Sequence, residues 1–520
     1  MAETDDQRAT IDFLSRPESY GLDGIVERID THAAIIFLAG EHAYKLKRAV
    51  RYPYLDFSTV ARRREVCEAE WRLNRRTAPE IYLEVRSVNR QADGSLGFGK
   101  GEPVDWLVVM QRFGADDLLE AVAARGDLTE TLVRDLADNI ADFHDGAEVA
   151  EEKSGSGRLR KVIDGNREAM AVLPADLLSK ADCESLYAAS LASLEHLSDL
   201  LDRRAATGHV RHCHGDLHLA NICLWQGKPT LFDCLEFDDG LATTDVLYDL
   251  AFLVMDLWEK GYRAQASLLF NRYLDCRMEI DGIAAMPLFL SVRAAVRAHV
   301  NATAAGRQAS QADRLAKRNS AREYLEAALS FLIRPEPRLI AIGGLSGTGK
   351  STLGAALAPD IGGVPGARWL RSDVMRKRLA GVAPETRLPP EAYTRDRNAQ
   401  VYDRLMQDAR RVLAAGHSVI VDAVFARPEE RAEPSAIAKE LGVPFLGLWL
   451  EAPTQTLLDR VSARKDDASD ADRSVVERQI RYDPGDLADW HRVAAGGGQA
   501  EVLAGARRLL APISGSVRTG

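Results

Sequence analysis

Apolar residues in the second half of the chain come in short runs, each followed by a longer stretch of helical periodicity. A short apolar run is typical of a buried strand, and strands that alternate with helices are typical of a parallel sheet. We therefore predict an α/β domain with a parallel sheet in residues 334–520. The four predicted strands are residues 338–343, 368–371, 418–422 and 445–450.

The first half of the chain begins with strands. Three apolar segments, separated by turn residues, are followed by a helical pattern with Ser58 as the expected N-cap. A further apolar strand precedes residue 113. We predict a small strand-rich lobe at about residues 20–113. Its predicted elements are strands at residues 24–30, 33–38, 42–47 and 106–110 and a helix at residues 58–76.

From residue 116 the pattern becomes largely helical and stays so, with one interruption, to residue 332. We predict a helix-rich lobe at about residues 114–333, which makes residues 1–333 an α+β domain. Proline cannot continue a helix, and Pro335 and Pro337 follow the last helical stretch. The predicted domain boundary therefore lies between residues 333 and 334.

The first predicted parallel strand runs directly into a glycine-rich loop with the spacing of a phosphate-binding P-loop. Glycine lets successive backbone N–H groups turn toward one centre, and the following helix adds its positive N-terminal end. We expect Lys350 to reach the terminal phosphates of ATP and the Ser351 hydroxyl to ligate Mg²⁺. The residues predicted to bind the nucleotide here are Gly344, Leu345, Ser346, Gly347, Thr348, Gly349, Lys350, Ser351 and Thr352.

Charged residues follow two other predicted strands. Asp373 and Arg376, three residues apart, would both project from the first turn of a helix toward the carboxyl ends of the strands. A carboxylate there can accept the proton of an acceptor hydroxyl, and an arginine can bind an anionic group. A helix-capping aspartate beside a surface arginine is the plainer alternative. Asp422 ends an apolar strand, and we expect it to hold Mg²⁺ through a water molecule.

This second half resembles the P-loop small kinases related to polynucleotide 5′-hydroxyl kinases, gluconate kinases and zeta-toxin-like enzymes. In those kinases a mobile lid carries arginines that clamp the transferred phosphate. The resemblance implies this role for Arg464, with Arg460 as the second choice, because both precede an acidic stretch at residues 465–470. The alternative is a solvated helix with exposed arginines.

A second group of candidate catalytic and metal-binding residues lies in the first half of the chain. His214-Gly215-Asp216 is followed by Asn221 and, after a predicted strand, by Asp233. Phosphoryl transfer needs a carboxylate to accept the proton of the attacking hydroxyl and further acceptors to hold magnesium. Asp216 suits the first role, and Asn221 and Asp233 suit the second. The nearby histidines read as structural imidazoles, although His212, His214 and His218 could also be zinc ligands.

This segment resembles the aminoglycoside phosphotransferase family, a branch of the protein-kinase-like fold, over about residues 25–300. The resemblance rests on His214 to Asn221 and on the stretch that ends in Asp249. It implies that Lys45 steadies the nucleotide phosphates and that Glu70 orients this lysine. Lys47 and Glu68 are the alternative pair, because strand alternation allows either lysine on the inward face.

The bulk composition excludes several classes of protein. The formal charge of −10 over 520 residues argues against non-specific binding of nucleic acid by the whole surface. The six cysteines form no CxxC pair, which is typical of reduced thiols in the cytoplasm. We see neither a signal peptide nor a run of membrane-spanning length, so we expect a cytoplasmic protein without a membrane partner.

The whole chain resembles a bacterial fusion of an aminoglycoside-phosphotransferase-like domain with a P-loop kinase. The leading hypothesis is a bifunctional phosphotransferase that uses ATP and Mg²⁺ to phosphorylate hydroxyl groups of small molecules, such as sugars, metabolites or antibiotics. In a second, the C-terminal half phosphorylates nucleic-acid 5′-hydroxyl ends. In a third, the chain is a regulatory ATP-binding protein whose kinase-like half is degenerate, since the first predicted turn of that half lacks glycine. The second hypothesis predicts a basic channel from Arg371, Arg376, Lys377, Arg378 and Arg387.

Overall fold

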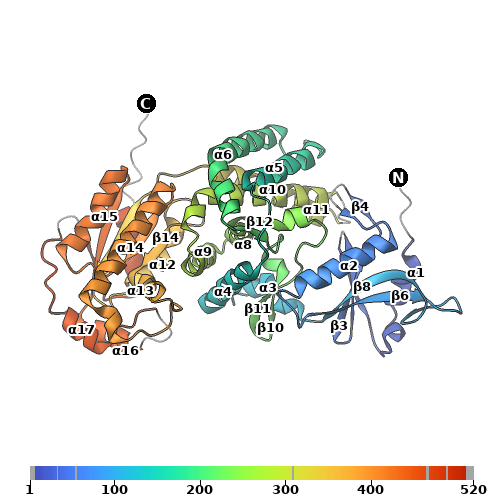
Figure 1. Ribbon diagram of the computed structural model, residues 1–520, viewed down its shortest axis with the longest axis horizontal. Helices are drawn as coiled ribbons and strands as arrows, with labels where there is room; N and C mark the ends of the chain where they lie inside the picture. The colour runs from blue at the N-terminus through green and yellow to red at the C-terminus, as the bar shows by residue number, and fades with distance from the viewer. Residues whose placement is uncertain are drawn as a thin grey trace. The chain divides into compact units, whose positions relative to one another are not determined.

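The computed structural model groups the chain into two compact units (Figure 1). One comprises Met1–Val162 with Ser198–Asp256, and the other comprises Ile163–Leu197 with Leu257–Gly520. The predicted division at residues 333 and 334 stays a prediction, because the contacts place residues 257–333 in the unit that holds the P-loop. The structure describes residues 6–31, 33–52, 55–306, 310–463, 468–487 and 490–510.

The first unit is built on an antiparallel sheet with the strand order β1-β2-β3-β8-β6-β7. Its elements are α1 (Arg8–Leu14), η1 (Pro17–Tyr20), β1 (Glu27–Asp30), β2 (Ala34–Ala39), β3 (His42–Lys47), β4 (Arg51–Tyr52), β5 (Leu55–Asp56), α2 (Val60–Asn74), β6 (Tyr82–Arg90), β7 (Leu96–Phe98), β8 (Glu102–Gln111), η2 (Ala115–Asp117), α3 (Leu119–Ala124), α4 (Glu130–Gly146), β9 (Val210–His212), η3 (Leu219–Asn221), β10 (Ile222–Trp225), β11 (Lys228–Leu231), α7 (Asp239–Ala242) and β12 (Thr243–Asp245). Three helices contribute residues to both units: α5 (Gly155–Ala171), α6 (Lys180–Ala206) and α8 (Val246–Glu259).

The three initial strands and the strand before residue 113 form as predicted. β3 lies between β2 and β8, and its side chains alternate between the two faces of the sheet. Tyr44 and Leu46 enter a core with Phe37, whereas Ala43 faces α2 through Cys67. Lys45 and Lys47 therefore share the face that looks toward α2. β6 and β7 were not predicted, because charged residues interrupt the apolar alternation of β6 and a register shift breaks its pairing with β8.

Helix α2 begins one residue later than the sequence suggested. Thr59, rather than Ser58, is its N-cap, and the Thr59 hydroxyl accepts from the N–H of Arg62. The Ser58 hydroxyl instead donates to Asp56 at 2.6 Å. The expectation for Ser58 was wrong because the preceding aspartate offers the hydroxyl a charged acceptor. The cap is still a hydroxyl residue, as helix N-termini prefer.

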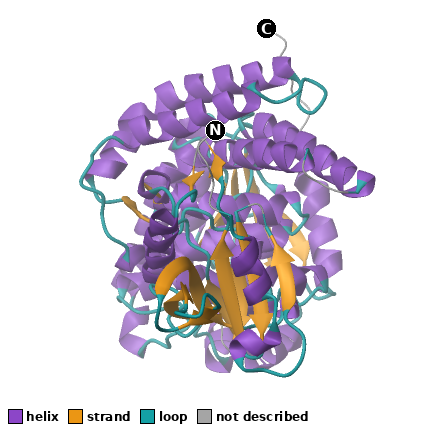
Figure 2. Cartoon of the chain, turned by 90° about the vertical axis from the view of Figure 1, so that its right-hand side faces the viewer, coloured by secondary structure: helices purple, strands orange, loops and turns teal. Residues whose placement is uncertain are grey.

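The second unit contains the predicted parallel sheet, in the order β14-β15-β13-β16-β17. Helices make up most of the rest of this unit, and they predominate in the chain as a whole (Figure 2). Its elements are α9 (Arg263–Arg277), η4 (Ile280–Ala285), α10 (Met286–Ala305), α11 (Gln311–Phe331), β13 (Leu339–Gly344), α12 (Lys350–Leu357), η5 (Ala358–Asp360), β14 (Arg368–Arg371), α13 (Ser372–Leu379), η6 (Pro390–Tyr393), α14 (Arg395–Ala414), β15 (Val419–Asp422), α15 (Pro428–Leu441), β16 (Phe445–Glu451), α16 (Thr454–Ala463), α17 (Arg473–Gln479), β17 (Trp490–Ala494) and α18 (Gln499–Leu510).

All four predicted parallel strands are present, and β17 adds a fifth at one edge. Its sequence mixes buried and exposed positions, which hid the strand from a search for apolar runs. One helical segment among the described residues, at 280–305, is long and apolar enough to span a membrane by composition. However, 67% of an apolar 18-residue window of that stretch is buried inside the fold, as is usual for a core helix.

Candidate active sites

The loop that carries Asp216 in the first unit is anchored by a buried carboxylate from α8. Asp249 is fully buried, and it accepts from the backbone N–H of Gly215 at 2.8 Å and of His214 at 3.1 Å. The His144 ring lies 3.2 Å from the same carboxylate. Gly215 has φ +82°, and a Cβ there would lie 2.8 Å from Leu235. The loop therefore needs both the glycine and the aspartate to present the next residue, Asp216.

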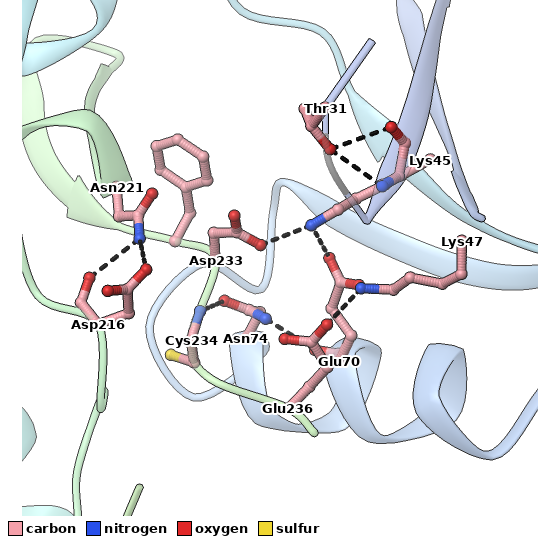
Figure 3. Close-up of polar contacts among 12 residues, drawn as sticks. Thr31, Lys45, Lys47, Glu70, Asn74, Asp216, Asn221, Asp233, Cys234 and Glu236 are labelled. Carbon is pink, nitrogen blue, oxygen red and sulfur yellow. Dashed lines mark hydrogen bonds and ion pairs between the residues drawn. The ribbon is translucent and has the colours of Figure 1, made fainter. Parts of the chain in front are cut away.

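The side chains of Asp216 and Asn221 lie in direct contact. The Asn221 side-chain amide donates to the Asp216 carboxylate at 2.9 Å and to the Asp216 backbone carbonyl at 2.9 Å (Figure 3). The His218 ring nitrogen lies 3.4 Å from the same carboxylate. The amide thus fixes the direction of the carboxylate, and its own oxygen is left as a possible metal ligand.

Lys45 meets two carboxylates. Its ammonium lies 2.7 Å from Glu70 of α2 and 2.6 Å from Asp233, which follows β11 (Figure 3). Although burial acts to lower the pKa of Lys45, Asp233 and Glu70 hold it well above its usual value. Burial acts to raise the pKa of Asp233, but Lys45 holds that pKa below its usual value. Lys45 and Asp233 are thus both charged, and they lie next to each other.

A second lysine extends this buried charge cluster. Lys47 pairs with the other oxygen of Glu70 at 2.5 Å and also with Glu236. Glu68, the alternative partner, is exposed and pairs with Arg64 instead. The structure therefore brings Lys45 to Glu70 and gives Lys47 the same partner. Glu236 was missed because it lies in a loop segment whose sequence alone gives no sign of burial.

The backbone at Asp233 is clamped on both sides. Asp233 has φ +60°, a conformation that non-glycine residues rarely adopt. Its N–H donates to the Tyr82 hydroxyl at 3.1 Å, and the next N–H, of Cys234, donates to the Asn74 side chain at 2.8 Å. Tyr82 and Asn74 are almost fully buried. These two side chains, which the sequence did not single out, hold the carboxylate of Asp233 in place.

The turn between β1 and β2, which lacks glycine, is held by an arginine. Arg48 donates through Nε to the carbonyl of Thr31 at 2.9 Å and forms an ion pair with Asp30. The turn is therefore fixed to the residue that follows β3.

In the second unit, the P-loop opens into a cavity of about 1270 Å³. Gly347 and Gly349 have φ +86° and +91°, and a Cβ on Gly347 would lie 2.8 Å from the Leu457 carbonyl oxygen. Helix α12 begins at Lys350, so its N-terminus faces this cavity. Gly344, Leu345 and Thr348 do not line the cavity. The other predicted loop residues do: Ser346, Gly347, Gly349, Lys350, Ser351 and Thr352.

The candidate metal ligands of this unit touch directly. The Ser351 hydroxyl donates to the Asp422 carboxylate at 2.7 Å. Burial raises the pKa of Asp422, and the charge of Lys350 partly opposes that rise. The hydroxyl and the carboxylate are oxygen donors of the kind Mg²⁺ prefers. The pair therefore fits a magnesium ion.

Asp373 and Arg376 both line the same cavity. Arg376 is 8% exposed; it donates to the Ala392 carbonyl at 2.9 Å, and its guanidinium stacks on Tyr393 at 4.7 Å. Its Nε has no hydrogen-bond partner within the described part of the chain. Arg376 is thus a held arginine beside a carboxylate, rather than a freely solvated one.

Of the two arginines predicted for the lid, the structure describes only Arg460. Arg464 lies outside the described residues. Arg460 donates to the Ala495 carbonyl at 2.8 Å and to the Gly347 carbonyl at 3.5 Å, so it ties the P-loop to the segment after β17. It does not line the cavity. Gln479 of α17, which the sequence did not suggest, accepts from the N–H of Ser346 at 2.8 Å.

The zinc alternative for the three histidines finds no support. Among the described residues, the group that could hold a metal by geometry is His144, Cys213 and Asp249, and it includes none of those histidines. The Asp249 oxygens of this group already accept backbone hydrogen bonds. The His214 ring instead contacts the Phe232 carbonyl at 2.9 Å.

Family models match both halves of the chain. Residues 62–287 match the phosphotransferase enzyme family, and residues 339–483 match an AAA domain. The chain joins a phosphotransferase-family domain to a P-loop kinase domain. It is therefore a kinase, with a kinase-like fold in the first half and a parallel P-loop sheet in the second, as predicted.

Known proteins resemble this kinase over different lengths. An uncharacterized protein of Mycobacterium tuberculosis (strain ATCC 25618 / H37Rv) is 29% identical over 480 residues, which are 88% of this chain and 91% of that protein. Adenylyl-sulfate kinase of Myxococcus xanthus is 31% identical over 118 residues, 22% of this chain and 59% of that enzyme. The crystal structure of a thermostable mutant of aminoglycoside phosphotransferase APH(4)-Ia is 13% identical, with a TM-score of 0.36, and the match covers 61% of this chain and 98% of that one.

Proposed function

We propose that the chain is a bifunctional kinase that transfers the γ-phosphate of ATP to hydroxyl groups of small molecules at two sites. The observation that carries this proposal is that each unit gathers the same three kinds of group. In the first unit these are Lys45, the paired Asp233 and the oriented Asp216. In the second, Lys350, Asp422 and Asp373 line one cavity. We place the reaction in the cytoplasm, as expected from the sequence.

The proposed roles follow from chemistry at each atom. Mg²⁺, when bound, neutralises the phosphate oxygens, and Asn221 with Asp233, and Ser351 with Asp422, are the residues that would hold it. Lys45 and Lys350 would bind the phosphates. Asp216 and Asp373 would accept the proton of the acceptor hydroxyl. The arginine beside Asp373, Arg376, would bind an anionic group of the acceptor.

The charge of the second cavity favours a small acceptor over a nucleic-acid end. Ten carboxylates line it, against seven lysine and arginine side chains, so the cavity is acidic overall. Four residues of the channel suggested by the sequence are ion-paired instead: Lys377 with Asp470, Arg378 with Asp408, Arg371 with Asp275, and Arg387 with Asp472. A polyanionic strand would be repelled by such a surface.

The test is transfer of label from γ-labelled ATP to a panel of hydroxyl compounds by the full-length protein. The panel includes sugars, aminoglycosides, adenylyl sulfate and a 5′-hydroxyl oligonucleotide. We expect Asp216→Asn to abolish labelling of one set of acceptors and Lys350→Ala to abolish labelling of another.

The matched control is Lys439→Ala, which removes an exposed lysine from α15 and should change neither set. If only the oligonucleotide is labelled, the acceptor class proposed here is wrong. If ATP is hydrolysed and no acceptor is labelled by either site, the proposal of kinase activity toward small molecules fails.

A further inference from the structure

Helix α9 lies within the stretch that matches the phosphotransferase family, yet it belongs to the compact unit that contains the parallel sheet. Its residues from Ala266 to Leu274 are mostly buried, on all sides of the helix. Three of these buried residues are polar: Ser267, Asn271 and Arg272. Buried polar side chains are normally hydrogen-bonded, so the partners of Asn271 and Arg272 indicate what the helix contacts.

Asn271 covers the open edge of the parallel sheet. β14 is an edge strand, and edge strands leave backbone groups without a strand partner. The Asn271 side chain accepts from the N–H of Trp369 at 2.7 Å and donates to the carbonyl of Ala367 at 3.1 Å. One amide side chain therefore replaces two bonds of a missing strand, and it fixes α9 along β14.

Asp275, one turn farther along α9, reaches two arginines of the same strand. Its carboxylate is 2.5 Å from Arg368 and 3.1 Å from Arg371, and it is 5% exposed. Burial acts to raise the pKa of Asp275, but the two arginines hold that pKa below its usual value. The carboxylate is thus charged, and its two oxygens divide between the two guanidinium groups.

Arg371 stands directly beside the candidate metal ligands. It is in register with Asp422 on the neighbouring parallel strand, so both side chains point to the same face of the sheet. It also lines a small hollow together with Ser351, Asp373 and Asp422. Its guanidinium stacks on Trp369 at 4.4 Å. Besides Asp275, the Arg371 side chain therefore has two further carboxylates nearby, those of Asp373 and Asp422.

We propose that Asp275 is a positioning residue for the second kinase site: it holds the Arg371 guanidinium back, so that Asp422 and Asp373 stay available to magnesium and to the acceptor. The inference rests on the proposed function of that site. Without Asp275, the guanidinium would pair with Asp422 or Asp373 and compete with the metal ion for the same oxygens. A helix from the phosphotransferase-family stretch would then set the metal requirement of the P-loop kinase.

The test measures Mg²⁺-dependent binding of an ATP analogue with a β,γ-imido bridge to the full-length protein. The share of binding that Lys350→Ala abolishes reports the second site. We expect Asp275→Asn to raise the Mg²⁺ concentration for half-saturation about tenfold, because the neutral amide releases Arg371. Asp275→Glu keeps the charge and should fold readily, and we expect a rise of about threefold since the longer side chain pushes the guanidinium toward Asp422.

Removing the Arg371 guanidinium should abolish the effect of Asp275→Asn on the Mg²⁺ requirement. Arg371→Gln combined with Asp275→Asn should restore the Mg²⁺ requirement of Arg371→Gln alone. The matched control is Arg272→Gln, which breaks the neighbouring α9 ion pair with Glu385. It should lower the melting temperature without changing the Mg²⁺ requirement.

Three results would overturn the inference: no shift in either Asp275 variant, a shift that persists in the double variant, or an equal shift in Arg272→Gln. Binding separates this inference from the proposed activity. If the Asp275 variants shift the Mg²⁺ requirement for binding but no acceptor is phosphorylated, the proposed function fails while the inference stands. If phosphate transfer is normal and the Asp275 variants leave the Mg²⁺ requirement unchanged, the inference fails while the proposed function stands.

Discussion

Asn74→Ala should weaken the first site by releasing the backbone around Asp233. The side chain is fully buried, and it makes one hydrogen bond within α2 and one to the segment that carries Asp233. Its Nδ2 donates to the Glu70 carbonyl at 2.9 Å, and its Oδ1 accepts from the Cys234 N–H at 2.8 Å. Alanine removes both bonds and leaves the Cys234 N–H buried without this acceptor.

The magnitude follows from these contacts. A lost hydrogen bond costs about 1 kcal/mol, and a buried donor left unsatisfied costs roughly 1–3 kcal/mol, so we expect a loss of about 2–4 kcal/mol in the free energy of unfolding. The left-handed conformation of Asp233 carries strain of order 1–3 kcal/mol. Without the hydrogen bond from Asn74, the backbone of Asp233 could relax by about 1–2 kcal/mol. Recovering the strained conformation for metal binding would then raise the Mg²⁺ requirement roughly 5- to 30-fold.

The assay compares Mg²⁺-dependent binding of the imido analogue in a Lys350→Ala background, which isolates the first site. Asn89→Ala is the matched control, since Asn89 is also buried and donates at 2.9 Å to Ser87 and at 2.6 Å to the Gly99 carbonyl in the same unit. We expect a similar loss of stability in the control and an unchanged Mg²⁺ requirement. An equal magnesium shift in both variants, or none in Asn74→Ala, would refute the role of the clamp.

Two further predictions concern the second unit. Gln479→Ala frees the Ser346 N–H for a phosphate oxygen, and we expect nucleotide affinity to rise about 3- to 10-fold in equilibrium binding; a fall in affinity would mean that Gln479 itself binds the nucleotide. Burial lowers the pKa of His417 to about 4 from an ordinary value of 6.5, so the unfolded state takes up the proton first. The stability contribution is intact above pH 6.5 and falls toward pH 4, by about 2–3 kcal/mol between pH 7 and 4.5. In urea unfolding, His417→Asn should flatten this fall; an unchanged pH profile would contradict the assignment.

The sequence predicted the parallel sheet and the P-loop well, because short apolar runs and glycine spacing are local properties. Alternation allowed either Lys45 or Lys47 on the inward face, and only the resemblance favoured Lys45; in the structure both lysines face α2. The structure explains why: the two lysines share one carboxylate, Glu70, through its separate oxygens. The choice was ambiguous because both residues belong to one cluster.

The remaining features could not be read from the sequence, because they depend on contacts between distant segments. Asn74 meets Cys234 from 160 positions away, and Asp275 meets Arg368 from 93 positions away. Neither residue belongs to a motif, and a buried asparagine or aspartate on a helix looks like any polar position. Helix α9 shows the same limit at the level of domains, since its sequence matches one family while its polar side chains complete the sheet of the other.

From the charge balance of both sites we predict that magnesium and nucleotide bind together. The charge cluster of the first unit holds three carboxylates against two ammonium groups, and of the carboxylates only Asp233 is substantially exposed: Glu70, Asp233 and Glu236 against Lys45 and Lys47. Burial raises the pKa of Glu236, and it also raises the pKa of Asp422 in the second unit, where carboxylates again exceed cations. An excess of carboxylates repels a polyanion such as ATP at either site, and in the first unit, where Glu70 and Glu236 are buried, it is also costly for stability. If the proposed function holds, a divalent cation would offset this repulsion at both sites, so we expect the acidic excess to favour joint binding of Mg²⁺ and nucleotide.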